Sequence, residues 1–76
     1  MISGTTWKHI NDNIMFNQFT VNANGDTCFS DGSRIRMNYQ GCFIYFYANG
    51  SYTGVDRMLL SPCVEAKIRK NAESVM

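Results

Sequence analysis

The chain has 76 residues with seven basic and six acidic side chains, so its formal net charge is +1 at neutral pH. This balance disfavours a protein that binds polyanions through a general excess of basic residues. The length predicts a single small domain over residues 1–76, which would bury only about 60% of the surface of its unfolded chain. Five phenylalanines, four tyrosines and one tryptophan supply the apolar area for one compact core.

The first part of the chain is predicted to hold a helical turn, a turn cluster and a strand. Trp7 and Ile10 lie three residues apart, which places both on one face of a short helical turn over residues 5–10. Residues 11–13, Asn-Asp-Asn, have the composition of a turn. Residues 14–22 then alternate in part, with Phe19 and Val21 on one face, and this pattern predicts a half-buried strand.

Turn signals divide the middle of the chain into five short strands. They are Asn24-Gly25, Ser30-Asp31-Gly32-Ser33, Gln40-Gly41 and Asn49-Gly50. Strands that follow one another so closely pair antiparallel, as a meander. The most apolar stretch, residues 42–47, is predicted to be the central strand and to be covered on both sides, because both of its faces carry apolar residues. Asn-Gly after this strand predicts a two-residue type I′ turn.

The last part of the chain is predicted to be helical. Residues 56–60 contain helix formers and no glycine, and Ser61-Pro62 then suits the N-cap and first position of a helix. This helix is predicted from Pro62 to about Asn71, with a break before it at Pro62. The predicted fold class is therefore α+β: a small antiparallel β-meander of four to five strands with a C-terminal helix packed on one face.

Two segments resemble the NUMOD modules of phage and intron HNH homing endonucleases. Residues 7–10 (Trp-Lys-His-Ile) and 19–26 resemble the Trp-x-x-Ile and aromatic-x-Val-Ser/Asn-x-x-Gly opening of those modules. Residues 45–47, 49–50 and 55–60 resemble the strand–turn–strand and helix that follow it. The resemblance implies a DNA-binding module without the nuclease core. Asp26 and Asp56 stand where the family tends to have a basic residue and a histidine, which weakens the implied DNA contact.

The sequence does not predict an enzyme, a cofactor or a metal site. Its single histidine, His9, is expected to be a surface residue rather than a general base, and the six carboxylates include no close pair. Cys28, Cys42 and Cys63 are too widely spaced for a structural zinc site, which normally uses close pairs. With no signal peptide or membrane-spanning run in the sequence, these thiols are expected to be reduced in a cytoplasmic protein.

Two kinds of binding function remain open. Arg34, Arg36 and Asn38 share one strand face, which is a pattern that can read base edges from a β-ribbon in the DNA major groove. Tyrosine and arginine are also enriched in the hot spots of protein interfaces. The near-neutral charge favours a phage-type accessory protein, in the host cytoplasm, that binds and inhibits a host or defence protein. The resemblance favours DNA, and a homodimer is open in either case. The candidate binding residues are Arg34, Arg36, Asn38, Tyr45, Tyr47, Tyr52 and Arg57.

Overall fold

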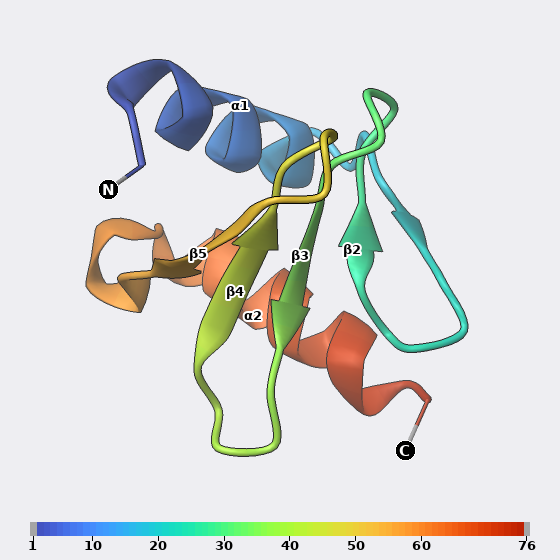
Figure 1. Ribbon diagram of the computed structural model, residues 1–76. Helices are drawn as coiled ribbons and strands as arrows, with labels where there is room; N and C mark the ends of the chain where they lie inside the picture. Colours follow the sequence, from blue (N-terminus) through green and yellow to red (C-terminus); the bar gives the residue numbers. More distant parts are fainter. Residues whose placement is uncertain (1, 76) are drawn as a thin grey trace.

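A five-stranded antiparallel sheet with both helices on one face forms the fold of the computed structural model, which describes residues 2–75 (Figure 1). The elements are α1 (Gly4–Met15), β1 (Thr20–Val21), β2 (Thr27–Cys28), β3 (Arg34–Met37), β4 (Phe43–Phe46), β5 (Tyr52–Val55), the 3₁₀ turn η1 (Arg57–Leu59) and α2 (Pro62–Glu73). The strands lie in the sheet in chain order, so the sheet is a meander. The predicted fold class, with α2 packed on one face, is confirmed.

The N-terminal helix is longer than the sequence pattern predicted. Ser3 caps it by accepting a hydrogen bond from the Thr6 backbone N–H at 3.2 Å. The turn predicted at residues 11–13 is wrong, because the helix continues through these residues to Met15. The Nδ2 atoms of Asn11 and Asn13 donate to backbone carbonyls four residues earlier, at 2.9 and 2.7 Å. The helix therefore includes Ile14, and the strand predicted over residues 14–22 is only Thr20–Val21.

All four hairpins use the same turn. In each, a backbone N–H donates to the carbonyl four residues later, which encloses three residues. The third of these is always a glycine with φ between 80° and 93°, namely Gly25, Gly32, Gly41 and Gly50. In each turn this glycine N–H donates to the carbonyl three residues earlier, at 3.0 to 3.2 Å. This is a type I turn followed by a glycine bulge. The type I′ turn predicted at Asn49-Gly50 is wrong, because only the glycine of that pair has positive φ.

The core lies between the sheet and the two helices. Ile35, Phe43 and Tyr45 point from the sheet toward Ile10 and Ile14 of α1, and all five side chains are buried. Val64, Ile68 and Ala72 of α2, which follow one another at intervals of four residues, complete this layer. The C-terminal helix begins at Pro62 as the sequence predicts, with the Ser61 hydroxyl accepting from the Val64 N–H.

The sheet has one covered and one uncovered face, which differs from the sequence prediction. The predicted central strand, β4, is an internal strand, but β3 is the middle one of the five. Ile44 and Phe46 of β4 lie half-exposed on the face away from both helices. We call this face the outer face. None of the helices in the described part of the chain is long and apolar enough to cross a membrane.

Candidate functional site

The strand register places a row of side chains across the outer face. The paired positions run through all five strands in the order Thr20, Cys28, Arg34, Phe46 and Tyr52. Paired residues of an antiparallel sheet point to the same face. A second row beside the first contains Arg36, Ile44 and Gly54. The outer face thus combines two arginines with aromatic and aliphatic side chains.

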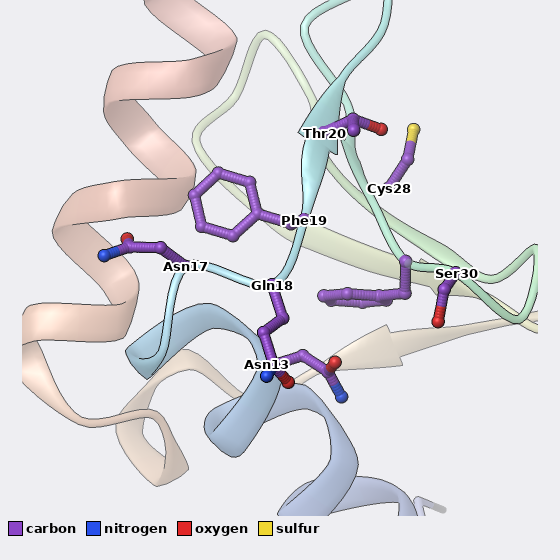
Figure 2. Close-up of a pocket in the computed structure, with 8 residues that line it drawn as sticks. Asn13, Asn17, Gln18, Phe19, Thr20, Cys28 and Ser30 are labelled. Carbon is purple, nitrogen blue, oxygen red and sulfur yellow. The ribbon is translucent and has the colours of Figure 1, made fainter.

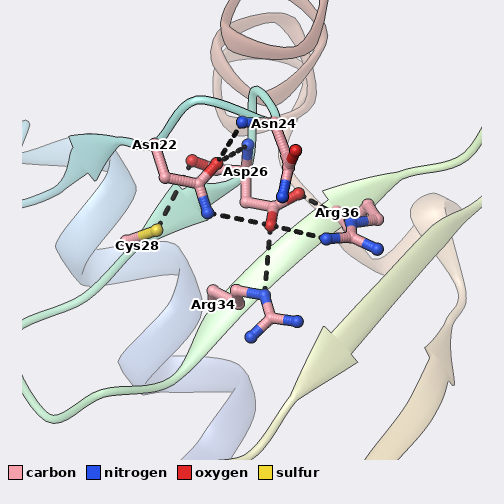
Figure 3. Close-up of polar contacts among 6 residues, drawn as sticks. All are labelled: Asn22, Asn24, Asp26, Cys28, Arg34 and Arg36. Carbon is pink, nitrogen blue, oxygen red and sulfur yellow. Dashed lines mark hydrogen bonds and ion pairs between the residues drawn. The ribbon is translucent and has the colours of Figure 1, made fainter.

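A buried carboxylate holds the two arginines in place (Figure 3). Asp26 has no solvent-exposed surface, although it lies beside the uncovered face of the sheet. Arg36 donates to it twice, from Nε to Oδ1 at 2.8 Å and from Nη2 to Oδ2 at 3.0 Å. Arg34 donates from Nε to Oδ2 at 3.1 Å, and Asn22 donates from Nδ2 to the same oxygen at 3.0 Å. The side chains of these partners cover the carboxylate and satisfy it.

The same turn that shapes the first hairpin also supports Asp26. The Asn22 side-chain oxygen accepts from the backbone N–H groups of Asn24 and Asp26, at 3.0 and 2.9 Å. Asn22 therefore fixes the Asp26 backbone with one end of its amide and the carboxylate with the other. Gly25 has φ of 80°, a conformation that favours glycine, and it completes this turn. The network therefore combines hydrogen bonds within the β1–β2 turn with hydrogen bonds from two arginines of β3.

The charges of this network are strongly coupled. Burial by itself would raise the pKa of Asp26, but hydrogen bonds from Arg36 and Asn22 and the charges of both arginines outweigh burial and hold that pKa below its usual value. The hydrogen bonds with Asp26 likewise raise the pKa of Arg36. The carboxylate is therefore ionised at neutral pH. It cancels one of the two positive charges on this part of the face.

An aromatic ring supports both guanidinium groups from the neighbouring strand. The Cζ atom of Arg34 lies 4.2 Å from the centre of the Phe46 ring, and that of Arg36 lies 5.4 Å away. Both distances are within the range of a cation–π interaction. Tyr52, on β5, packs against Phe46 with the two ring centres 5.8 Å apart, and its side chain is 70% exposed. The arginines are thus held between a carboxylate and an aromatic ring.

The other predicted binding residues have different places in the structure. Tyr45 is buried on the inner face, and Tyr47 is half-buried against it with the two ring centres 4.9 Å apart. The Asn38 side-chain oxygen accepts from two backbone N–H groups and stabilises the β3–β4 turn. The Arg57 side chain lies outside the described part of the structure. Of the predicted set, the structure brings together Arg34, Arg36 and Tyr52.

Sequence reasoning missed two members of this group, Asp26 and Phe46. Asp26 follows an Asn-Gly turn, and aspartate is common in turns as a solvent-exposed residue, so its position did not indicate a buried carboxylate. Phe46 alternates with buried residues along an apolar strand, so the pattern alone placed it in a core. The information that was missing is the register of the β2–β3 and β3–β4 hairpins, which determines which residues lie opposite one another. It places Phe46 opposite Arg34, and it places Asp26, one residue before the Thr27–Ile35 pair, across from Arg36.

A pocket of about 590 Å³ lies next to one end of the outer face, between the end of α1 and the first hairpin (Figure 2). It is lined by Asn13, Asn17, Gln18, Phe19, Thr20, Cys28, Phe29 and Ser30. None of these side chains is normally charged at neutral pH, so the pocket offers no acid–base pair. Burial, and the nearby charge of Asp26, raise the pKa of the Cys28 thiol, which disfavours the reactive thiolate.

A histidine, a serine and an aspartate meet beside this pocket, where α1 packs on the β2–β3 turn, but their geometry is not that of a nucleophilic triad. The Nε2 atom of His9 lies 3.4 Å from Ser33 Oγ and 3.3 Å from Asp31 Oδ2. In a triad the nucleophile and the carboxylate bind opposite nitrogens of the ring. Here both contact the same nitrogen, and Ser33 is only 1% exposed. His9 itself is half-buried, which differs from its expected surface position.

The described residues contain no group of three or more histidine, cysteine, aspartate or glutamate side chains that could hold a metal ion. The three cysteines are free, with Cys42 and Cys63 exposed and Cys28 half-buried.

Comparison with protein-family models, with curated proteins and with solved structures finds no match for this chain. The resemblance to NUMOD modules therefore stays a prediction from the sequence.

Proposed function

We propose that the protein is a non-catalytic binding module whose outer sheet face holds a protein partner. The observation that carries this proposal is the network of Asp26, Arg34, Arg36 and Phe46. It fixes two long side chains on a face that neither helix covers. Ordering an arginine normally costs conformational entropy on binding, and a network that orders it beforehand lowers that cost.

The composition of the face supports a protein partner. Arginine and tyrosine are the residues most enriched in interface hot spots, together with tryptophan. Arg34, Phe46 and Tyr52 form one row, and Ile44 beside them adds aliphatic surface. Further exposed apolar side chains follow β5 directly in η1, where Met58 is 87% and Leu59 is 62% exposed. Apolar residues at the centre of such a face and polar ones around it are typical of protein interfaces.

The mode of action that fits this face is occlusion of a partner's surface. In our proposal the protein is an accessory factor of the phage type, which inhibits a host or defence protein by covering the surface that the partner needs. The chain's net charge of +1 and the partial neutralisation of the arginines by Asp26 favour a protein partner over nucleic acid. This proposal requires no reacting group.

The test is a pull-down from bacterial lysate with two matched tyrosine variants. Tyr52→Ala removes an exposed ring from the outer face, while Tyr39→Ala removes a ring that is 96% exposed in the β3–β4 turn. We expect a protein that is retained after nuclease treatment, lost with Tyr52→Ala and kept with Tyr39→Ala. Capture that disappears with nuclease, or that both variants retain, would contradict the proposal.

A second candidate function, DNA binding through the same strand, is favoured by one observation. Among the described residues, both Nη atoms of Arg34 and the Nη1 atom of Arg36 have no hydrogen-bond partner, so they are free to contact phosphates or base edges. The test is fluorescence anisotropy with random duplex DNA at low salt. Arg34→Gln is preferable to Arg36→Ala, because loss of Arg36 leaves Asp26 buried with only one arginine. Binding lost in Arg34→Gln supports DNA, and no binding by the unaltered chain excludes it.

A further inference from the structure

At one end of the sheet α1 passes two hairpin turns (Figure 1). A depression of about 460 Å³ lies among residues of these three segments. Thr5, Thr6 and His9 line it from α1, and Asp31 from the β2–β3 turn. The remaining lining residues lie at the end of β4 and in the turn after it: Tyr45, Tyr47, Ala48 and Asn49. It is therefore separate from the outer face, at the edge formed by three different parts of the chain.

The only carboxylate of this depression is held in a fixed position. Asp31 Oδ1 accepts hydrogen bonds from the backbone N–H of Ser33, at 2.9 Å, and from the Ser33 hydroxyl. The hydrogen bond from the Ser33 side chain is the main reason that the pKa of Asp31 lies below its usual value. The Asp31 side chain is nevertheless 49% exposed, so a ligand can reach the charged carboxylate.

His9 completes this arrangement as a hydrogen-bond donor. The Asn13 side-chain N–H group lies 3.1 Å from His9 Nδ1, which assigns the acceptor role to that nitrogen and the proton to Nε2. Nε2 then points its hydrogen at Asp31 Oδ2, 3.3 Å away. Asp31 is thus the one carboxylate of the depression, and no lysine or arginine lines it.

Aromatic rings provide the second half of a cation site. Tyr45 and Tyr47 pack edge to face, with an angle of 81° between their planes, and both line the depression, Tyr45 buried and Tyr47 half-buried. A carboxylate combined with aromatic ring surface is the chemistry that recognises a guanidinium, which can stack on a ring while it donates to the carboxylate. Charge complementarity therefore selects a cationic occupant.

We propose that this depression binds an arginine side chain of a protein partner. The guanidinium would donate to Asp31 and stack against Tyr47, and the exposed Thr5 hydroxyl oxygen lies at the same depression as a further acceptor. This gives the molecule a second contact point, distinct from the outer face. The inference rests on the proposed function only for the source of the arginine, and its test uses a small probe that needs no partner.

The test is an NMR titration of the ¹⁵N-labelled protein with N-acetyl-arginine amide. N-acetyl-citrulline amide is the control, because it has nearly the same shape without the charge. We expect the arginine probe to shift the amide signals of Thr6, Asp31 and Asn49 and to bind at least about tenfold more tightly than the citrulline probe. Equal binding of the two probes, or shifts confined to other residues, would overturn the proposal.

Variants and a third probe sharpen the result. Asp31→Asn removes the charge but keeps an oxygen that can accept from the Ser33 N–H, and it should weaken the arginine probe at least about tenfold. Asp12→Asn removes an exposed carboxylate of α1 that pairs with Lys8, and it should change nothing. Asp31→Asn that binds as well as the unaltered chain contradicts the site. If Asp31→Asn does not fold, the citrulline comparison on the unaltered chain decides alone. Free arginine that binds more tightly than the capped probe would assign the depression to a free amino acid and contradict a partner's side chain.

Discussion

Replacing Arg36 with alanine should destabilise the fold much more than replacing Arg34. Arg36 donates two hydrogen bonds to a carboxylate without exposed surface, whereas Arg34 donates one, at 3.1 Å. Removing one partner of a buried ion pair costs about 3–5 kcal/mol, because the other charge stays buried. The Arg36 side chain is 37% exposed, so water can enter the vacated space and the lower end of that range applies. We expect a loss of about 3 kcal/mol for Arg36→Ala and about 1.5 kcal/mol for Arg34→Ala.

The assay is equilibrium unfolding in urea, followed by the fluorescence of Trp7, the only tryptophan. Lys70→Ala is the matched control, since it removes a positive charge from an exposed position of α2 and should change stability by less than about 0.5 kcal/mol. A double-mutant cycle of Arg36→Ala with Asp26→Asn isolates the pair and should give a coupling energy of at least about 1.5 kcal/mol. An effect of Arg36→Ala no larger than that of Arg34→Ala, or a coupling energy of zero, would refute the reasoning.

Three more predictions concern pH, a turn and a helix contact. The folded-state pKa of Asp26 is lowered, so its stabilisation is present above the unfolded value of about 3.9 and is lost as pH falls through the folded value. Urea unfolding from pH 6 to pH 3 should thus show a smaller loss of stability in Asp26→Asn than in the unaltered chain. Gly25→Ala should lower the melting temperature more than Gly50→Ala. Both glycines have positive φ, but a Cβ on Gly25 would lie 2.8 Å from Val75 Cγ2, while one on Gly50 would meet nothing within 4 Å. Lys67→Met should cost about 1 kcal/mol in urea unfolding, because the ammonium donates to the Ile14 and Met15 carbonyls at the end of α1. An unchanged midpoint for Lys67→Met, or equal effects of the two glycine variants, would contradict these assignments.

The hairpins could be predicted from the sequence because their signals are local. Each turn has a glycine at a fixed place, and the alternation of Arg34 to Met37 shows which side chains share a face. Ser61-Pro62 similarly fixes the start of α2. The error at Asn49-Gly50 arose because Asn-Gly suits two turns that differ by one residue in length. The structure distinguishes them by the hydrogen bond from the Tyr47 N–H to the Ser51 carbonyl and by positive φ at Gly50 but not at Asn49.

The candidate site could be predicted only in part, because its energetics depend on register. Arg34 and Arg36 were identified as neighbours on one face, but the sequence does not show that both donate hydrogen bonds to a buried carboxylate. A one-residue change of register would move Asp26 to the opposite face of the sheet. The full length of α1 was missed for a related reason. Asn11 and Asn13 usually favour turns, and here their side chains bond to helix carbonyls instead.

The order of the strands has a consequence for how the chain folds. Every strand pairs with its immediate neighbour in sequence, so each hairpin closes only a short loop and pays little loop-closure entropy. The packing of α1 on α2 is different: the Lys67–Ile14 hydrogen bond joins residues 53 positions apart. The sheet can therefore assemble one hairpin at a time, in chain order. The face of the sheet that the helices cover is completed only when α2 has left the ribosome. Until then only α1 can cover the apolar side chains of β3 and β4, and this interval is when the chain is most vulnerable to aggregation.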